Sequence, residues 1–207
     1  MKRIFLLFTA FLLASCANKS MPRYETLAPT LEKKGFDATI AEVKDQKEDL
    51  YGSNSEFLYY YDLGVLHHYN RNFDESIKNF AKAEKIYEDL YTKSVTNEAA
   101  ALLTNDNVRP YRARPFELLT LYQLQILNYL AKADLDGALV EVKRSQIAMN
   151  ALYQKDQDKV NDNGFLRYLS ALVYDLDGEK DDAAISYYKA IKAYDESKMG
   201  VPKEVFE

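Results

Sequence analysis

The sequence predicts an all-α protein built from stacked helical hairpins. Charged residues make up 29% of the 207 residues, whereas Gly and Pro number only 7 and 5, a balance that favours helices over sheets. A pattern of small, large and small side chains also recurs at helical spacing. Apolar residues account for 47% of the chain, so it has enough apolar surface to form a packed core.

The recurring pattern is clearest in residues 57–90. Small side chains let two antiparallel helices approach closely, and large ones fill the space between them. The small residues are Gly64, Ser76 and Ala83, and the large ones are Tyr60, Leu63 and Phe80. This stretch resembles one tetratricopeptide (TPR) repeat, with departures at His67 and Glu88, where that family usually has Tyr and Pro. The resemblance implies a fold and says little about function.

The first 15 residues are typical of an export signal. Lys2 and Arg3 precede an apolar run from Ile4 to Ala14, which is shorter than the ~20 residues that a membrane-spanning helix needs. The end of the run, Leu13-Ala14-Ser15-Cys16, resembles the bacterial lipobox. That resemblance implies a mature chain that begins at a lipidated Cys16. The alternative is an ordinary signal peptide with a chance cysteine.

Cys16 is the only cysteine in the chain, so it has no internal disulfide partner. In lipoproteins an Asp after the cysteine usually retains the protein at the inner membrane, and Ala17 stands there instead. We therefore expect the cell envelope, with the lipid in the outer membrane and the protein facing the periplasm. The chain is acidic, with a formal net charge of −5, and cleavage would remove two cations and no acid. Nucleic acid is a poor candidate for a partner of such a chain.

Residues 16–28 are predicted to form a lipidated tether, and residues 29–198 a right-handed TPR-like solenoid of about four repeats. Residues 36–40 echo residues 73–77, which indicates that residues 36–51 form the second helix of a degraded first repeat. Gly35 suits the turn before that helix, and Ser55 suits the N-cap of the helix that opens the second repeat.

An insertion at residues 91–118 interrupts the regular spacing. Thr96-Asn97-Glu98 followed by apolar residues predicts a short separate helix ending at Leu103. Residues 104–117 then carry turn residues and prolines, and Pro115 suits the first turn of a new helix.

Two further units follow the insertion. Helices are predicted over residues 116–133 and from Asp134 onward, and then from Phe165 and after a turn at Gly178. The small–large–small residues of these units are Ala138, Val142 and Ser145, and Ala183, Tyr187 and Ala190. Gly137 is expected to serve close packing or to lie in the first turn of its helix. The tail, residues 199–207, is predicted to be frayed.

The middle of the chain also resembles a family of bacterial TPR-like lipoproteins. The resemblance covers about a fifth of the chain and implies a cell-envelope lipoprotein without an established activity. The segments that carry it are Arg109-Pro110-Tyr111, Pro115-Phe116-Glu117, Leu127-Asn128-Tyr129-Leu130 and residues 137–144.

The sequence indicates no catalytic residue, cofactor or metal. His67 and His68 are the only histidines, and neighbours on a helix point about 100° apart, so they are poorly placed to share a metal. His67 is expected to face inward. The segments beginning at Asp156 and Asp175 approach calcium-loop spacing but do not complete it, which leaves at most a weak surface ion site. Glu117 and Glu141 are better read as a capping charge and an exposed or paired charge than as an acid–base pair.

The insertion carries the candidate partner-binding site. Three arginines fall within residues 109–114 of an acidic chain, next to aromatic side chains, and this combination is typical of binding hot spots. The candidate residues are Arg109, Tyr111, Arg112, Arg114, Phe116 and Glu117. The alternative is internal: these arginines pair with the array's own acids and clamp the insertion onto the third repeat.

Two classes of function remain. The first is a non-catalytic protein-binding scaffold or assembly factor, held at the membrane by the lipid on Cys16 and docking an envelope protein or peptide. The second is a small-molecule-binding lipoprotein that serves a transporter from a pocket between helices. An enzyme is a distant third.

Overall fold

The computed structural model describes residues 22–101, 110–155, 162–198 and 200–206, and all regular structure in these ranges is helical. The prediction of an all-α protein is confirmed. None of the described helices combines the length and the apolar character needed to cross a membrane. The elements are α2 (Pro22–Asp45), α3 (Lys47–Tyr51), α4 (Glu56–Tyr69), α5 (Phe73–Ala101), α6 (Pro115–Ala131), α7 (Leu135–Lys155), α8 (Gly164–Asp177), α9 (Lys180–Glu196) and the 3₁₀ turn η2 (Lys203–Val205).

The chain divides into two compact units, Met1–Leu50 and Tyr51–Glu207. In the first unit, α2 is interrupted at Gly35, whose backbone has φ 80° and ψ −173°. Glycine adopts this conformation at little cost because it has no Cβ, so the predicted turn at Gly35 is confirmed. The Thr39 hydroxyl donates to the Gly35 carbonyl at 2.9 Å, in the first turn of the helical stretch that follows.

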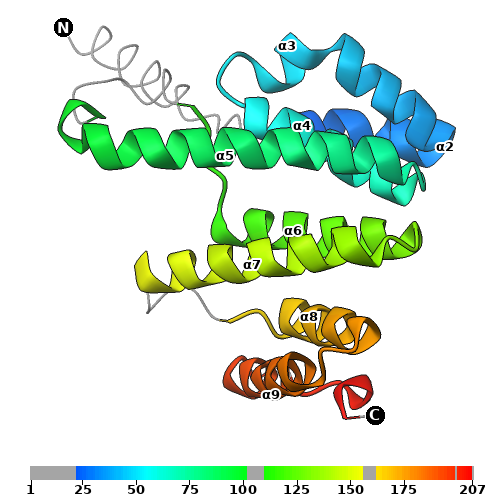
Figure 1. Cartoon of the computed structure of the whole chain (residues 1–207). Coiled ribbons are helices and arrows are strands. Elements are labelled where there is room, and N and C mark those ends of the chain that lie inside the picture. Colours follow the sequence, from blue (N-terminus) through cyan, green and yellow to red (C-terminus); the bar gives the residue numbers. More distant parts are fainter. Residues whose placement is uncertain (1–21, 102–109, 156–161, 199, 207) are drawn as a thin grey trace, which may run out of the picture. The chain divides into compact units, whose positions relative to one another are not determined.

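The described part of the second unit contains three helical hairpins in consecutive layers, α4 with α5, α6 with α7, and α8 with α9 (Figure 1). Neighbouring layers pack through α5 against α6 and through α7 against α8. The first helices of the hairpins also touch, α4 against α6 and α6 against α8. The two helices of each hairpin therefore pack on each other, and neighbouring hairpins also pack on each other.

The three hairpins turn in the same way. At equivalent places, Arg71, Ala133 and Gly178 adopt positive φ values of 60°, 56° and 87°. In each turn a backbone N–H then reaches back to a carbonyl near the end of the first helix at 2.9 Å, a bond that satisfies groups left free at a helix end. These bonds run from Asn72 to His67, from Asp134 to Tyr129 and from Glu179 to Tyr174.

The small residues that were predicted to lie between helices are all buried. They are Gly64, Ser76, Ala83, Ala138, Ala183 and Ala190. In each hairpin a glycine also faces an aromatic ring of the partner helix, and a Cβ added there would overlap the ring. The pairs are Gly64 with Phe80, Gly137 with Tyr129, and Gly164 with Tyr194. Gly137 both allows close packing and lies in the first turn of α7, where its N–H donates to Asp134 Oδ1 at 2.9 Å.

Several local expectations need correction. Tyr60 is half-buried beneath the Lys82 ammonium, and Phe57, which is 1% exposed, fills the interior instead. This arrangement leaves the polar end of a tyrosine near water. Ser55 does precede α4, but its side chain makes no capping hydrogen bond.

The predicted separate helix at residues 96–103 is wrong as far as Ala101. Helix α5 runs without a break from Phe73 to Ala101, because no Gly or Pro lies between them to stop it. The end of the predicted helix, residues 102 and 103, lies outside the described residues.

The prediction of a frayed tail is also wrong for the described part of the C-terminus. The 3₁₀ turn η2 packs against α9, and Val205, 6% exposed, joins a buried cluster with Ala190 and Tyr194. Burial of Val205 supplies the apolar contact that orders the segment.

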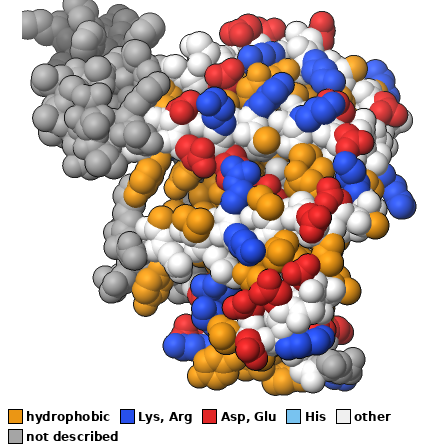
Figure 2. All heavy atoms as spheres, in the orientation of Figure 1, with side chains coloured by type: hydrophobic (Ala, Val, Ile, Leu, Met, Phe, Trp, Pro, Cys, Tyr) orange, Lys and Arg blue, Asp and Glu red, His pale blue; other side chains and the backbone are white. Residues whose placement is uncertain are grey.

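The outer surface combines charge of both signs with apolar side chains. Figure 2 shows acidic and basic side chains interspersed over the described part of one face. The last hairpin exposes several large apolar side chains, with exposed fractions of 67% for Leu176, 50% for Ile185 and 69% for Tyr188.

Candidate functional site

A cavity of about 460 Å³ lies among α6, α7, α8 and α9 in the second unit. Its lining combines a buried, largely apolar part with an exposed, charged part. The buried lining residues are Leu119, Met149, Arg167 and Ala193, and the more exposed ones are Asn150, Tyr153, Asp162, Lys189, Lys192 and Glu196. This size is within the range of small-molecule sites, about 300–1,000 Å³.

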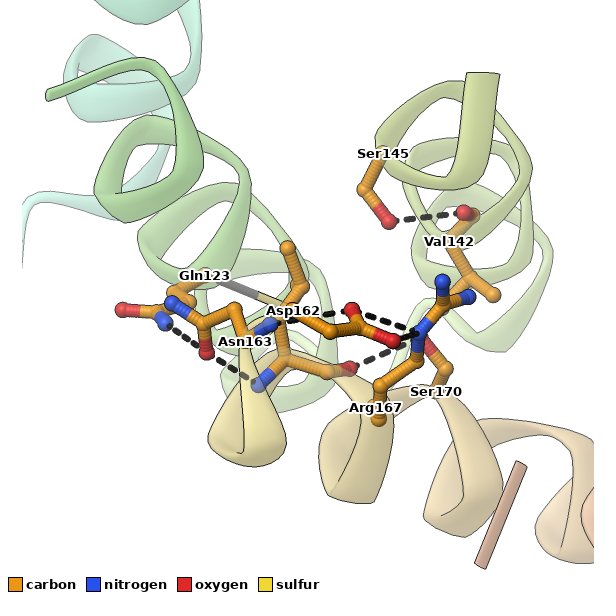
Figure 3. Close-up of polar contacts among 8 residues, drawn as sticks. Gln123, Val142, Ser145, Asp162, Asn163, Arg167 and Ser170 are labelled. Atoms are coloured by element: carbon orange, nitrogen blue, oxygen red, sulfur yellow. Dashed lines mark hydrogen bonds and ion pairs between the residues drawn. The ribbon is translucent and has the colours of Figure 1, made fainter. Parts of the chain in front are cut away.

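Arg167 is the buried cation of this pocket, with only 8% of its surface exposed. Its Nε donates to both oxygens of Asp162, at 3.0 and 3.1 Å (Figure 3). The terminal nitrogens Nη1 and Nη2 make no hydrogen bond to any described residue, and neither is fully enclosed. One edge of the guanidinium is therefore fixed by Asp162, and the other is available to a ligand.

The loop before α8 holds this pair in position. The backbone N–H of Asn163 donates to Asp162 Oδ1 at 2.9 Å. The Asn163 side chain caps α8 by accepting from the N–H of Leu166 at 2.9 Å, and it also accepts from Gln123 Nε2 at 3.0 Å (Figure 3). Through Gln123, helix α6 therefore fixes the start of α8, the helix that carries Arg167.

The charges of the pocket suit an anion. Its lining carries three cations, Arg167, Lys189 and Lys192, against two acids, Asp162 and Glu196. Lys192 lies 3.6 Å from Glu196, and both side chains are more than half exposed, so water weakens this pair. Among the described lining residues, the cations therefore exceed the acids by one.

The structure divides the predicted partner-binding residues into two groups. Arg109 lies outside the described residues. Tyr111 and Glu117 satisfy each other, because the Tyr111 hydroxyl donates to both Glu117 oxygens at 2.8 Å. Glu117 also accepts from the N–H of Arg114 at 2.7 Å, which closes the N-terminus of α6. The N–H of Tyr111 donates to the Asn54 carbonyl at 2.6 Å, so the segment is fastened to the loop before α4.

The second group, Arg112, Arg114 and Phe116, is exposed, and we call it the arginine edge. Phe116 is 59% exposed. Within the described ranges, neither Arg112 nor Arg114 has a carboxylate at ion-pair distance. The internal clamp is therefore made by Tyr111, Glu117 and the backbone N–H of Arg114, and the guanidinium groups of the two arginines take no part in it.

This division predicts different effects on stability. Tyr111→Phe removes the hydroxyl that donates to the buried Glu117 carboxylate and should lower the free energy of unfolding by about 1 kcal/mol. Arg112→Ala combined with Arg114→Ala should leave it unchanged within about 0.5 kcal/mol. Urea denaturation measures both, with the exposed Tyr153→Phe as the matched control for Tyr111. A double-arginine variant less stable than Tyr111→Phe would contradict the assignment.

A second polar cluster is buried between the first two layers of the second unit. Tyr122 donates to Glu84 Oε1 at 2.5 Å, and Arg144 Nη2 lies 2.6 Å from Glu84 Oε2. Arg144 Nη1 is 3.4 Å from Glu141 Oε1, while Glu141 Oε2 is buried without a hydrogen-bond partner among the described residues. One cation thus serves two carboxylates that are 1% and 2% exposed.

Burial raises the pKa of both carboxyl groups in this cluster. The pKa of Glu141 rises to about 7, because burial outweighs the opposing effect of Arg144 and the Glu84 charge adds to the rise. The pKa of Glu84 is also raised by burial, against the hydrogen bond from Tyr122 and the charge of Arg144. The cluster links α5, α6 and α7, but at high pH it holds two ionised carboxylates in a buried position that disfavours their charge.

The raised pKa of Glu141 predicts a pH-dependent stability. Between the unfolded pKa of about 4.5 and the folded value of about 7, the folded protein binds more protons than the unfolded chain. The stability that this difference in proton binding contributes is fully present below pH 4.5 and is lost as the pH rises through about 7. Glu141→Gln, which cannot ionise, should therefore be more stable than the wild type at pH 8, by on the order of 2 kcal/mol, and nearly equal to it at pH 5.

Thermal unfolding at both pH values checks this difference. Asp136→Asn, which removes an exposed acid from the same helix, should leave the pH dependence of the wild type in place. An equal effect of Glu141→Gln at pH 5 and pH 8 would show that ionisation of Glu141 is not the cause.

The two histidines lie where helices pack. His67 is 5% exposed, as expected for an inward position. His68 Nδ1 donates to Asn128 Oδ1 at 2.7 Å, and Asn128 Nδ2 in turn donates to Ser76 Oγ at 2.8 Å. His68 thus links α4 to α6, and this structural role accounts for the histidine.

The carboxylates of Glu117 and Glu141 interact with different partners. Glu117 interacts with Tyr111 and Arg114, whereas Glu141 interacts with Arg144. The calcium-like segment at Asp156 lies outside the described residues, and Asp175 pairs with Lys180 at 2.6 Å. In the described ranges, no three His, Cys, Asp or Glu side chains are grouped in a way that would hold a metal.

Sequence reasoning missed Arg167, although one signal was present. Arg167 stands at the place in its hairpin that Tyr60 and Tyr122 occupy in theirs, where a large inward side chain is expected. A cation at a position where a large inward side chain is expected indicates a polar site in the interior. The Glu84 cluster left no such signal, because its members come from three helices and meet only when the layers pack.

Comparisons of this chain with protein-family models, with curated proteins and with solved structures give no match.

Proposed function

We propose that this protein is a membrane-anchored, TPR-like lipoprotein that acts as a non-catalytic binding scaffold in the bacterial envelope. The anchor is a lipid on Cys16, and the protein faces the periplasm from the outer membrane. The support is the short apolar run that ends in the lipobox-like residues 13–16. These residues lie outside the described part of the chain.

The TPR-like array is supported by repetition. The three hairpins share a turn conformation, a glycine packed on an aromatic ring and small residues at the crossings. In addition, Val65, Leu127 and Leu172 occupy equivalent places on α4, α6 and α8, and each is half-buried. In a TPR array the first helices line the concave surface that docks peptides or helices, so these positions favour binding there.

The observation that carries the binding role is the arginine edge. Arg112, Arg114 and Phe116 are exposed, and the segment beneath them is fixed by the bonds of Tyr111 to Glu117 and Asn54. An arginine guanidinium binds carboxylates with paired hydrogen bonds, and a neighbouring aromatic ring adds apolar contact. Because the backbone is already held, docking loses less conformational entropy. The partner is therefore an acidic segment of an envelope protein or peptide.

Cross-linking in cells tests this role. A photo-reactive residue at Thr120, next to the edge, should capture a specific protein in the wild type and lose it in Arg112→Ala with Arg114→Ala. Lys143→Ala with Lys85→Ala, which removes two exposed cations elsewhere, should retain the capture. Equal capture by the double-arginine variant at equal abundance would contradict docking at this edge.

The anchor has its own test. Cys16→Ser should release the protein from membranes or leave residues 1–15 uncleaved. A processed Cys16→Ser chain that still fractionates with membranes would exclude a lipid on this residue.

A second function, a small-molecule-binding lipoprotein associated with a transporter, is favoured by the pocket around Arg167. Its volume of about 460 Å³ and its buried cation are features of a ligand site. A small molecule that co-purifies with the protein would favour this alternative.

A further inference from the structure

We propose that the pocket among α6, α7, α8 and α9 binds a monovalent organic acid. The carboxylate of the ligand lies on the terminal nitrogens of Arg167, and its apolar part lies on Leu119, Met149 and Ala193. The inference rests on the pocket alone and not on the anchor or on the arginine edge, so each can fail separately.

The guanidinium geometry selects a carboxylate. Asp162 occupies Nε of Arg167, and the end of the fork, Nη1 and Nη2, makes no hydrogen bond to any described residue (Figure 3). Two parallel N–H groups match the two oxygens of a carboxylate. Arg167 is more than nine-tenths buried, so water competes weakly for this edge. A buried guanidinium whose terminal nitrogens have no partner gains most from an anion placed there.

The charge of the lining favours a single negative charge. Three cations face two acids, so one negative charge on the ligand balances the site. A phosphate dianion would overcompensate the lining and would also meet Asp162 beside Arg167. A monovalent carboxylate fits this balance better.

The apolar part of the lining requires an apolar substituent. Leu119 is 5% exposed, Met149 4% and Ala193 3%, and Tyr153 adds a partly exposed ring at the end of α7. Burial of an aliphatic chain here contributes roughly 0.8 kcal/mol for each methylene group. The same chemistry is found in a free aliphatic acid and in the C-terminal residue of a peptide, and the experiment separates these sources.

The test follows the methyl resonance of Met149 in the full-length protein labelled at methionine methyl groups. The probes are hexanoate for a free acid and N-acetyl-leucine for a peptide terminus. Hexanamide and N-acetyl-leucinamide are their neutral controls, and inorganic phosphate is the dianion control. Both acids should shift the Met149 resonance in a saturable way, and the amides and phosphate should not. Tighter binding of N-acetyl-leucine indicates a peptide source, and tighter binding of hexanoate indicates a free acid.

Three variants locate the binding. Arg167→Gln should weaken the acids about tenfold or more, because a charge-assisted pair is lost. Lys189→Gln with Lys192→Gln, which changes only exposed residues, should weaken them about threefold without a change in melting temperature. Lys143→Gln, an exposed cation of α7 outside the pocket, should have no effect.

Any of four results would overturn the proposal. They are amides that shift Met149 as strongly as the acids, phosphate that displaces hexanoate at equal concentration, acids that give no shift, and a folded Arg167→Gln that binds as the wild type does. If Arg167→Gln does not fold, the double-lysine variant decides: unchanged affinity of the acids would count against the site.

Discussion

At pH 8, Arg144→Met is expected to lower the free energy of unfolding by about 3 to 5 kcal/mol. Arg144 is the only cation that the structure pairs with Glu84 and Glu141 in the described residues, and both carboxylates are almost fully buried. Methionine keeps much of the side-chain volume but leaves two buried charges uncompensated. Chemical denaturation of wild type and variant at pH 8 measures the loss.

The same substitution should cost less at pH 5. Burial raises the pKa of both carboxyl groups, so protonation removes the stranded charges as the pH falls. Lys143→Met, at the neighbouring exposed position, should change stability by less than about 0.5 kcal/mol at either pH. A loss for Arg144→Met that is independent of pH would indicate lost packing rather than uncompensated charge.

Gly64→Leu should lower the free energy of unfolding by about 2 to 3 kcal/mol, because the first hairpin of the second unit has no room for a side chain there. A Cβ at Gly64 would lie 2.6 Å from both Cδ1 and Cε1 of Phe80. Phe80 is fully buried, and the close packing of a protein interior opposes displacement of its ring. Thermal and urea unfolding measure the effect.

A double variant assigns the effect to this contact. Gly64→Leu with Phe80→Ala exchanges large for small across the crossing and should be more stable than the sum of the two single losses predicts. Ala81→Leu, on the exposed side of α5, is the control and should be nearly neutral. An unchanged melting temperature for Gly64→Leu would contradict the register of this hairpin.

Helix boundaries were predictable where a single residue determines them. Pro115 begins α6, and Gly178 closes the turn between α8 and α9. The same kind of turn at Arg71 and Ala133 carries no such mark, since non-glycine residues adopt positive φ there. The small residues at the crossings were predictable as well, because their spacing repeats.

The polar sites were not predictable, because they depend on contacts between distant residues. Glu84, Tyr122 and Arg144 meet only when three helices pack. The pocket needs four helices and the orientation of Arg167 by Asp162. The insertion was predicted in part. Glu117 was expected to act as a capping charge at the helix N-terminus, but its hydrogen bond with Tyr111 depends on the path of the loop.

Native mass spectrometry of the protein extracted from membranes reads the anchor and the partner in one spectrum. We expect a chain that begins at Cys16, carries the added mass of a lipid and is accompanied by a second protein. That second protein should be absent from the Arg112→Ala, Arg114→Ala variant. A chain that retains residues 1–15 without a lipid, and that carries no bound protein, would exclude a lipid-anchored binding scaffold.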